Sequence, residues 1–198
     1  LSIQTDAGII AKGTFGSGVI LQDHPINVSL FIWYPRKAAF RAGRLVNNTQ
    51  WNDTSTGNYS IALGKDSKAT GNYSVVGGGD GNTASYQYAS VIGGQNNTAS
   101  GPYAVIVGGA SNATNETYTT IVGGQSNTAN NLSSAVGGGQ SNQVSGLGTA
   151  SNIGGGSTNT ILLPYSNING GKNNTIDQMD AAPAIQNTAQ LLVPSLSI

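Results

Sequence analysis

The chain has 198 residues, among them 29 Gly, no Cys, 1 Met and 1 His, and its 8 basic and 8 acidic side chains give a formal net charge of zero. Charged residues make up 8% of the sequence, roughly a third of the usual share, and glycine is about twice as frequent as in a typical domain. This composition excludes a basic nucleic-acid surface, a disulfide framework, a thiolate nucleophile and a zinc cluster. No apolar run approaches the roughly 18 residues of a membrane-spanning helix, so we expect no membrane insertion.

The N-terminal part, positions 1–56, differs from the rest of the chain. Residues 1–30 alternate weakly between apolar and polar side chains, which favours strands or a linker. Residues 31–56 hold most of the large aromatic side chains, namely Phe31, Trp33, Tyr34, Phe40 and Trp51. We interpret this group as a cap, because the end of a stack of strands exposes apolar core and unpaired backbone groups unless something covers it. A sugar-binding platform is the alternative interpretation of the same cluster.

A short repeat occupies positions 57–180, and a Gly-Gly pair recurs in it. The first glycine of each pair serves as the anchor of its copy, and the anchors are Gly78, Gly93, Gly108, Gly123, Gly138, Gly155 and Gly170. The step from one anchor to the next is constant except between Gly138 and Gly155, where it is slightly longer. An earlier and slightly shorter copy begins at Gly57 and ends before Gly71, so the chain contains eight copies.

The length of the period selects the architecture. Helical repeats need about 33–47 residues and propeller blades about 40–50, whereas a period of about 15 residues holds only two short strands and two turns. The sequence therefore predicts an all-β fold, a β-solenoid of about eight coils.

Three rows of side chains are predicted to face the interior, because strand side chains alternate between faces. The row two residues before the anchor is β-branched throughout: Val76, Val91, Ile106, Ile121, Val136, Ile153 and Ile168. The row four residues after the anchor is asparagine throughout: Asn82, Asn97, Asn112, Asn127, Asn142, Asn159 and Asn174. Six residues after the anchor, the side chains are mostly small or apolar, as at Ala84 and Ile161. We expect the asparagines to form a ladder of stacked side-chain amides, because buried amides need hydrogen-bond partners.

A row of tyrosines is predicted on the outside, with a parity opposite to that of the core rows. It lies five residues before the anchor, at Tyr73, Tyr88, Tyr103, Tyr118 and Tyr165. A thin single solenoid buries little apolar surface per coil against the backbone entropy of ordering that coil, so we expect an oligomer. The candidates for its interface, or for a glycan contact, are Tyr73, Tyr88, Tyr103 and Tyr118.

The first copy resembles a known repeat. Its sequence Gly57-Asn58-Tyr59-Ser60-Ile61-Ala62-Leu63-Gly64 is similar to the head repeat of YadA-like trimeric autotransporter adhesins. Later copies, such as Gly93-Gly94-Gln95-Asn96-Asn97-Thr98-Ala99-Ser100, are more similar to relatives of that repeat in viral and phage tail-fibre proteins. The segment 32–43, followed by Gln50-Trp51, resembles the block that precedes such repeats in fibre proteins. The resemblance implies a left-handed parallel β-roll that assembles as a homotrimer.

Catalytic residues, cofactors and metal ions are not expected. Asp80 follows three glycines, as in a calcium-binding repeat, but Gln95 and Ala110 replace it in the next copies, so no carboxylate array is available. His24 and Asp23 are adjacent residues without a recognisable nucleophile. The other candidate acids for glycoside cleavage do not recur in register: Asp53, Asp66 and Glu116. Among the glycosylation sequons, the one at Asn112 is predicted to be buried and unmodified.

These features predict a non-enzymatic structural or adhesive surface fibre, located outside the cell or on a virion. The fibre would be a trimeric stalk or head that displays a surface to a host receptor or a polysaccharide. A purely architectural virion or filament subunit is the alternative, and a glycan-degrading tailspike is a weaker one. Residues 181–198 are apolar with two prolines, and we expect them to form a C-terminal extension.

Overall fold

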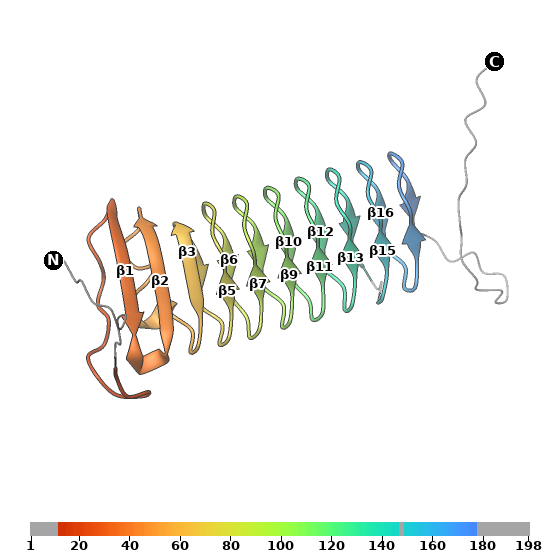
Figure 1. Cartoon of the computed structure of the whole chain (residues 1–198). Helices are drawn as coiled ribbons and strands as arrows, with labels where there is room; N and C mark the ends of the chain where they lie inside the picture. The colour runs from red at the N-terminus through yellow and green to blue at the C-terminus, as the bar shows by residue number, and fades with distance from the viewer. Residues whose placement is uncertain (1–11, 147–148, 178–198) are drawn as a thin grey trace, which may run out of the picture.

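The computed structural model describes residues 12–146 and 149–177. The expected C-terminal extension 181–198 and positions 1–11 of the N-terminal segment lie outside the described residues. Within these ranges the chain is an all-β parallel β-solenoid of about 8 turns, with coils of about 15 residues. Figure 1 shows the coils stacked side by side into a straight rod, with a hairpin at the N-terminal end. The predicted solenoid and its period are therefore confirmed.

Two sheets run along the rod. The longer sheet has ten strands, which it joins in the order β1 (Val28–Tyr34), β2 (Ala39–Leu45), β3 (Ile61–Lys65), β5 (Val75–Val76), β7 (Ser90–Val91), β9 (Val105–Ile106), β11 (Thr120–Ile121), β13 (Ala135–Val136), β15 (Asn152–Ile153) and β17 (Asn167–Ile168). The shorter sheet has eight strands, which are β4 (Lys68–Ala69), β6 (Thr83–Ala84), β8 (Thr98–Ala99), β10 (Ala113–Thr114), β12 (Thr128–Ala129), β14 (Gln143–Val144), β16 (Thr160–Ile161) and β18 (Thr175–Ile176). Each full coil thus contributes one very short strand to each sheet.

Two turns close each coil, and both are tied to the neighbouring coils. In the glycine turn, a third row of bridges links residues such as Gln95 and Ala110 in parallel. The opposite turn contains the tyrosine of the repeat, which lies in the left-handed region, as at Tyr103 with a φ of 57°. Because every segment of the coil bonds to its neighbours, this short period is enough to build the rod.

An apolar core runs along the interior of the rod. The β-branched row and the row six residues after the anchor form one continuous cluster in which nearly every side chain is fully buried. Val76 and Ile153 are 0% exposed, and Ile168 near the C-terminal end of the rod is 7% exposed. Register explains this arrangement, since Val91 pairs with Ile106 and Ala84 with Ala99 along the two sheets.

The second glycine of each pair is required by close backbone contact. Gly109 has a φ of +89°, and a Cβ placed on it would lie 2.1 Å from the carbonyl oxygen of Gly124 in the next coil. Five further second glycines have the same contact with the following coil: Gly79, Gly94, Gly124, Gly139 and Gly156. A Cβ on the anchor Gly108 would meet nothing within 4 Å. The conformational freedom of glycine is therefore needed at the second position of the pair, as at Gly109, and not at the anchor Gly108.

The N-terminal end is built from different elements. Strands β1 and β2 form an antiparallel hairpin, and the 3-10 helix η1 (Pro35–Lys37) and Ala38, in the left-handed region, connect them. Strand β2 then pairs in parallel with β3 of the first coil. A second 3-10 helix, η2 (Asp53–Ser55), precedes that coil. Asn52 lies at the start of η2, and its side chain accepts a hydrogen bond from the Ser55 N–H. The hairpin thus extends the ten-stranded sheet beyond the first repeat.

Candidate functional site

The predicted asparagine ladder lies inside the rod, but its hydrogen bonds differ from the expected stack of amides. The side-chain oxygen of Asn112 accepts the backbone N–H of Asn127 at 2.9 Å. Its side-chain nitrogen donates to the carbonyl oxygens of Gly108 at 3.1 Å and Gly124 at 3.0 Å. The same pattern recurs along the row, and a side-chain to side-chain bond joins only Asn159 and Asn174 among the described asparagines of the row. Each amide therefore fastens the glycine turn of its own coil to that of the next.

The predicted aromatic cap divides into buried and exposed members. Trp51 is 0% exposed and Tyr34 is 3% exposed, so these two rings lie in the interior. Phe31 is 78% exposed and Trp33 is 42% exposed, because alternation along β1 directs them to the opposite face from Tyr34. Phe40 is partly buried and meets Phe31 edge to face at 5.0 Å. The expectation that all five aromatics form one plug is therefore wrong for Phe31 and Trp33.

A buried arginine covers the end of the core, and the sequence analysis did not single it out. Arg41 pairs in register with Ala62, so it occupies the first position of the column that Val76 and Val91 continue. It is 0% exposed. Its guanidinium donates to the carbonyl oxygens of Phe40, Ser60 and Ala69 and to the Ser60 hydroxyl, at 2.7–2.9 Å. Burial lowers the pKa of Arg41 to about 10.

Trp51 and Gln50 act in the same way as Arg41. The Trp51 indole donates to the carbonyl oxygen of Ser67 at 2.8 Å, and the Gln50 amide donates to that of Asp66 at 3.1 Å. In later coils, a backbone N–H of the preceding coil bonds to the carbonyl equivalent to that of Ser67, as Lys68 N–H does to Asn82. Trp51 and Arg41 thus supply side-chain N–H donors where a preceding coil would supply backbone ones.

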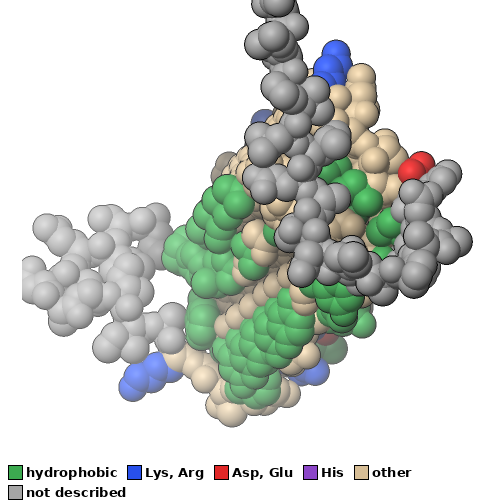
Figure 2. Space-filling view, turned by 90° about the vertical axis from the view of Figure 1, so that its right-hand side faces the viewer, with side chains coloured by type: hydrophobic (Ala, Val, Ile, Leu, Met, Phe, Trp, Pro, Cys, Tyr) green, Lys and Arg blue, Asp and Glu red, His purple; other side chains and the backbone are tan. Residues whose placement is uncertain are grey.

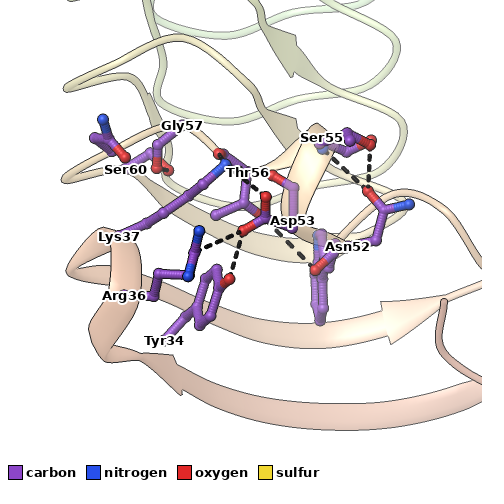
Figure 3. A network of polar contacts seen from close by, with 12 residues as sticks. Tyr34, Arg36, Lys37, Asn52, Asp53, Ser55, Thr56, Gly57 and Ser60 are labelled. Atoms are coloured by element: carbon purple, nitrogen blue, oxygen red, sulfur yellow. Dashed lines mark hydrogen bonds and ion pairs between the residues drawn. The ribbon is translucent and has the colours of Figure 1, made fainter. Parts of the chain in front are cut away.

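A polar network ties the hairpin to η2, as Figure 3 shows. The Tyr34 hydroxyl donates to the Asp53 carboxylate, and Arg36 and Lys37 form ion pairs with it at 3.8 and 3.6 Å. The Lys37 ammonium also donates to the backbone carbonyl of Asp53 and to that of Thr56, the latter at 2.8 Å. Burial, and then the hydrogen bond to Asp53, raise the pKa of Tyr34. These polar groups thus satisfy one another in structural contacts.

The tyrosines form a stack along one edge of the rod. Ring centroids of neighbouring coils lie 4.8–5.1 Å apart, and the rings are nearly parallel, from Phe15 at the N-terminal end to Tyr118 at the other. We call this stack the tyrosine ladder; its members are Phe15, Tyr59, Tyr73, Tyr88, Tyr103 and Tyr118. They are 38–57% exposed. Tyr165 lies beyond Ser133 and Ala150 and is 76% exposed.

A second exposed apolar surface covers the outer side of the ten-stranded sheet. We call it the apolar face; its members are Phe31, Trp33, Phe40, Ile61, Leu63, Val75, Ile92, Val105, Val107 and Val122. Ile92, Val107 and Val122 are 45–53% exposed. Figure 2, which views the rod from its C-terminal end, shows hydrophobic side chains in rows that follow the solenoid, with few charged side chains between them. In the sequence, an apolar residue stands directly beside many of the core valines and isoleucines. This pattern indicates the apolar face, and the sequence analysis overlooked it.

The candidate acids Asp80 and Asp66 are held in structural contacts. Asp80 forms an ion pair with Lys65 at 2.8 Å. Asp66 accepts the backbone N–H of Val46 at 2.7 Å, and Glu116 is exposed. None of these contacts places two carboxylates on opposite sides of a cleft.

His24 and Asp23 also make separate contacts. The backbone N–H of His24 donates to the carbonyl oxygen of Asn48 at 3.0 Å, and the Asp23 carboxylate accepts from the Asn52 amide at 2.9 Å. In residues 12–146 and 149–177 there is no group of three or more His, Asp or Glu side chains that could hold a metal ion. Over the same residues, no helix has the length and apolar character to cross a membrane.

Comparison with known proteins adds no family assignment. No protein-family model matches the chain, and a search of curated proteins finds no match. The resemblance to YadA-like head repeats and to tail-fibre repeats therefore stays a prediction, which the confirmed parallel β-solenoid is compatible with.

Proposed function

We propose that the chain is a left-handed β-roll that assembles as a homotrimer and forms the rigid stalk or head of a surface fibre. The fibre displays a surface to a host receptor or a polysaccharide, outside the cell or on a virion, and carries out no reaction itself. The observation that supports the proposal best is the apolar face, because a surface of this kind needs a partner of the same length and the same repeat.

The apolar face has the properties of a subunit interface. Alternation along the strands puts Ile92 and Val107 on the outside while Val91 and Ile106 are buried inside. From Val75 to Gly137 the outward positions of this sheet carry no charged side chain. Contiguous exposed apolar patches of more than a few hundred Å² are rare on monomers and mark interaction sites. Another copy of the chain has the same spacing between coils, so it can match the face along its whole length.

A trimer would also explain how the fibre binds. Eight coils at about 4.8 Å each give a rod of roughly 40 Å. Three copies would present three identical surfaces at fixed separation, so weak contacts with a repetitive receptor would reinforce one another through effective concentration. Much of the surface left outside the trimer would be polar, as at Thr98 and Gln125.

The mass of the purified chain in solution tests the assembly. Light scattering should give about three times the 20.0 kDa of one chain. Val107→Asp should reduce the mass to that of a monomer, because it places a carboxylate in the interface. Its matched control is Ser126→Asp, at an exposed position of the glycine turn, which should keep the trimer. A folded monomer of the unmodified chain, or a V107D protein that stays trimeric, would contradict this assembly.

A glycan array then tests the display function. The trimer should bind a subset of glycans, and the V107D monomer should bind the same ones at least tenfold more weakly because avidity is lost. A trimer that binds no glycan and no cell surface would favour the architectural role. Release of reducing ends from a bound polysaccharide would instead show that the fibre is an enzyme.

A further inference from the structure

The backbone sets the spacing of the tyrosine ladder. The five tyrosines of the ladder, from Tyr59 to Tyr118, have φ values of 56–60°. In this conformation each backbone N–H points along the rod, and the N–H of Tyr88 donates to the carbonyl of Asn72 at 3.0 Å, while that of Tyr103 donates to Gln87 at 3.1 Å. The Cα atoms that carry the rings therefore repeat at the spacing of the coils.

The stacking decides which part of each ring a ligand can reach. Neighbouring ring planes are inclined by only 10–21°, so each inner ring is stacked between one neighbour on each face. Solvent meets the ring edges and the hydroxyl groups, and among the described residues none of the five ladder hydroxyls has a hydrogen-bond partner. A sugar ring needs an open aromatic face to stack on, and each inner ring already has a neighbour stacked on both of its faces. A row of ring edges can pack edge to face against another planar aromatic system, which is one of the arrangements that aromatic pairs prefer.

We propose that the tyrosine ladder is a binding site for elongated planar aromatic molecules, which lie lengthwise on it with one face across the ring edges. A ligand that spans four coil spacings contacts five rings at once, and the rings are already in place before it binds. Affinity therefore depends on an unbroken ladder and on the length of the ligand. This site is independent of the proposed fibre function and of the trimer, because its residues lie on the edge of the rod and outside the apolar face.

Thioflavin T is a suitable probe, since it is long and planar and becomes fluorescent when its central bond is held rigid. The full chain should raise its fluorescence at least tenfold with saturable binding, and benzothiazole alone, which spans about one ring, should compete at least tenfold more weakly. Binding should persist in high salt, because the contact does not rely on charge. The signal should elute with the soluble protein in size-exclusion chromatography; a signal that sediments with aggregates would overturn the proposal.

The chain provides its own control substitutions. Tyr88→Ser divides the ladder in the middle, and Ser133 already occupies the equivalent position of a later coil with a φ of 58°, so the substitution suits the fold. It should weaken thioflavin T binding at least fivefold. Tyr165→Ser, which removes an isolated exposed ring, should leave binding unchanged, and Ser133→Tyr, which lengthens the ladder by one ring, should strengthen it. Absence of binding to the unmodified chain, or equal binding to Y88S, would overturn the proposal.

Discussion

The cap and the repeats both provide hydrogen-bond donors for the carbonyl groups of the coils, but they do so with different groups. In the repeats, one set of contacts is copied from coil to coil, and Asn112 makes the same three hydrogen bonds as Asn97 and Asn127. In the cap, each contact occurs once. Arg41 and Trp51 donate to carbonyls of the first coil that backbone N–H groups serve in every later coil.

The difference teaches how the two regions respond to change. A repeat contact has identical neighbours on both sides, so a substitution there disturbs a local stretch of the rod. A cap contact has no equivalent elsewhere, and its loss exposes the end of the core. Four substitution pairs, ordered by expected effect, test this comparison.

The largest effect is expected in the glycine turn of the repeats. Gly109→Ala forces a Cβ to within 2.1 Å of the Gly124 carbonyl oxygen and keeps an alanine at a φ of +89°. Because backbone atoms must move in two coils, we expect a loss of more than about 4 kcal/mol in the free energy of unfolding. Denaturant unfolding at equal chain concentration measures it. Gly108→Ala is the control and should change stability little; equal losses for the two alanines would contradict the contact.

The next effect concerns the two tryptophans of the cap. Trp51→Ala removes a side chain that is 0% exposed and the donor to Ser67, so we expect a loss of about 3–5 kcal/mol. Trp33→Ala removes a ring that is 42% exposed. Made in the monomeric V107D chain, it should hardly change the free energy of unfolding. A Trp51 variant as stable as the Trp33 variant would show that Trp51 does not close the core.

The asparagine row should be less sensitive than Trp51. Asn112→Ala removes one acceptor and two donors, and leaves the N–H of Asn127 and two glycine carbonyls without this partner. With the buried N–H of Asn127 left unpaired, we expect a loss of about 3 kcal/mol. Asn115→Ala, at an exposed position of the same coil, should cost less than about 0.5 kcal/mol. Hydrogen exchange should show the loss of protection concentrated in the coils next to Asn112.

The smallest effect is expected at Tyr34. Tyr34→Phe removes the hydroxyl bond to Asp53, which keeps Arg36 and Lys37 as partners, so we expect a loss of about 1–2 kcal/mol at neutral pH. Burial raises the pKa of Tyr34 above its ordinary value of 10.0. Because the folded-state pKa is the higher one, the neutral phenol stabilises the fold fully below about pH 10, and this stability declines as the pH rises through the folded-state pKa.

A pH series of denaturant melts checks the second half of that prediction. Stability of the unmodified chain should fall above about pH 10, and the fall should be smaller in Tyr34→Phe. Tyr165→Phe is the control, since its ring is 76% exposed. If both variants show the same decline as the unmodified chain, the buried phenol does not contribute to it.

Prediction from sequence succeeded where the structure repeats itself. The β-branched row at Val76 and Val91 and the asparagine row at Asn82 and Asn97 stand out because identical environments select similar residues coil after coil. Sequence reasoning failed at single contacts and at finer geometry. It grouped Phe31 with Trp51, overlooked Arg41, and expected amide-to-amide bonds that the shape of the glycine turn replaces with bonds to the backbone.

The sequence by itself determined the period, the parallel stacking of coils and the inward rows, because a short repeat with strand parity leaves few other ways to pair its backbone. The tertiary structure alone decided which side chains close the N-terminal end and how the tyrosines meet. Arg41 and Ala69 are distant in the chain and touch only because β2 pairs with β3. The tyrosine rings stack because the tyrosines of successive coils share the same left-handed backbone conformation (positive φ), which puts them in line. Both results depend on the placement of neighbouring segments, which local residue patterns do not record.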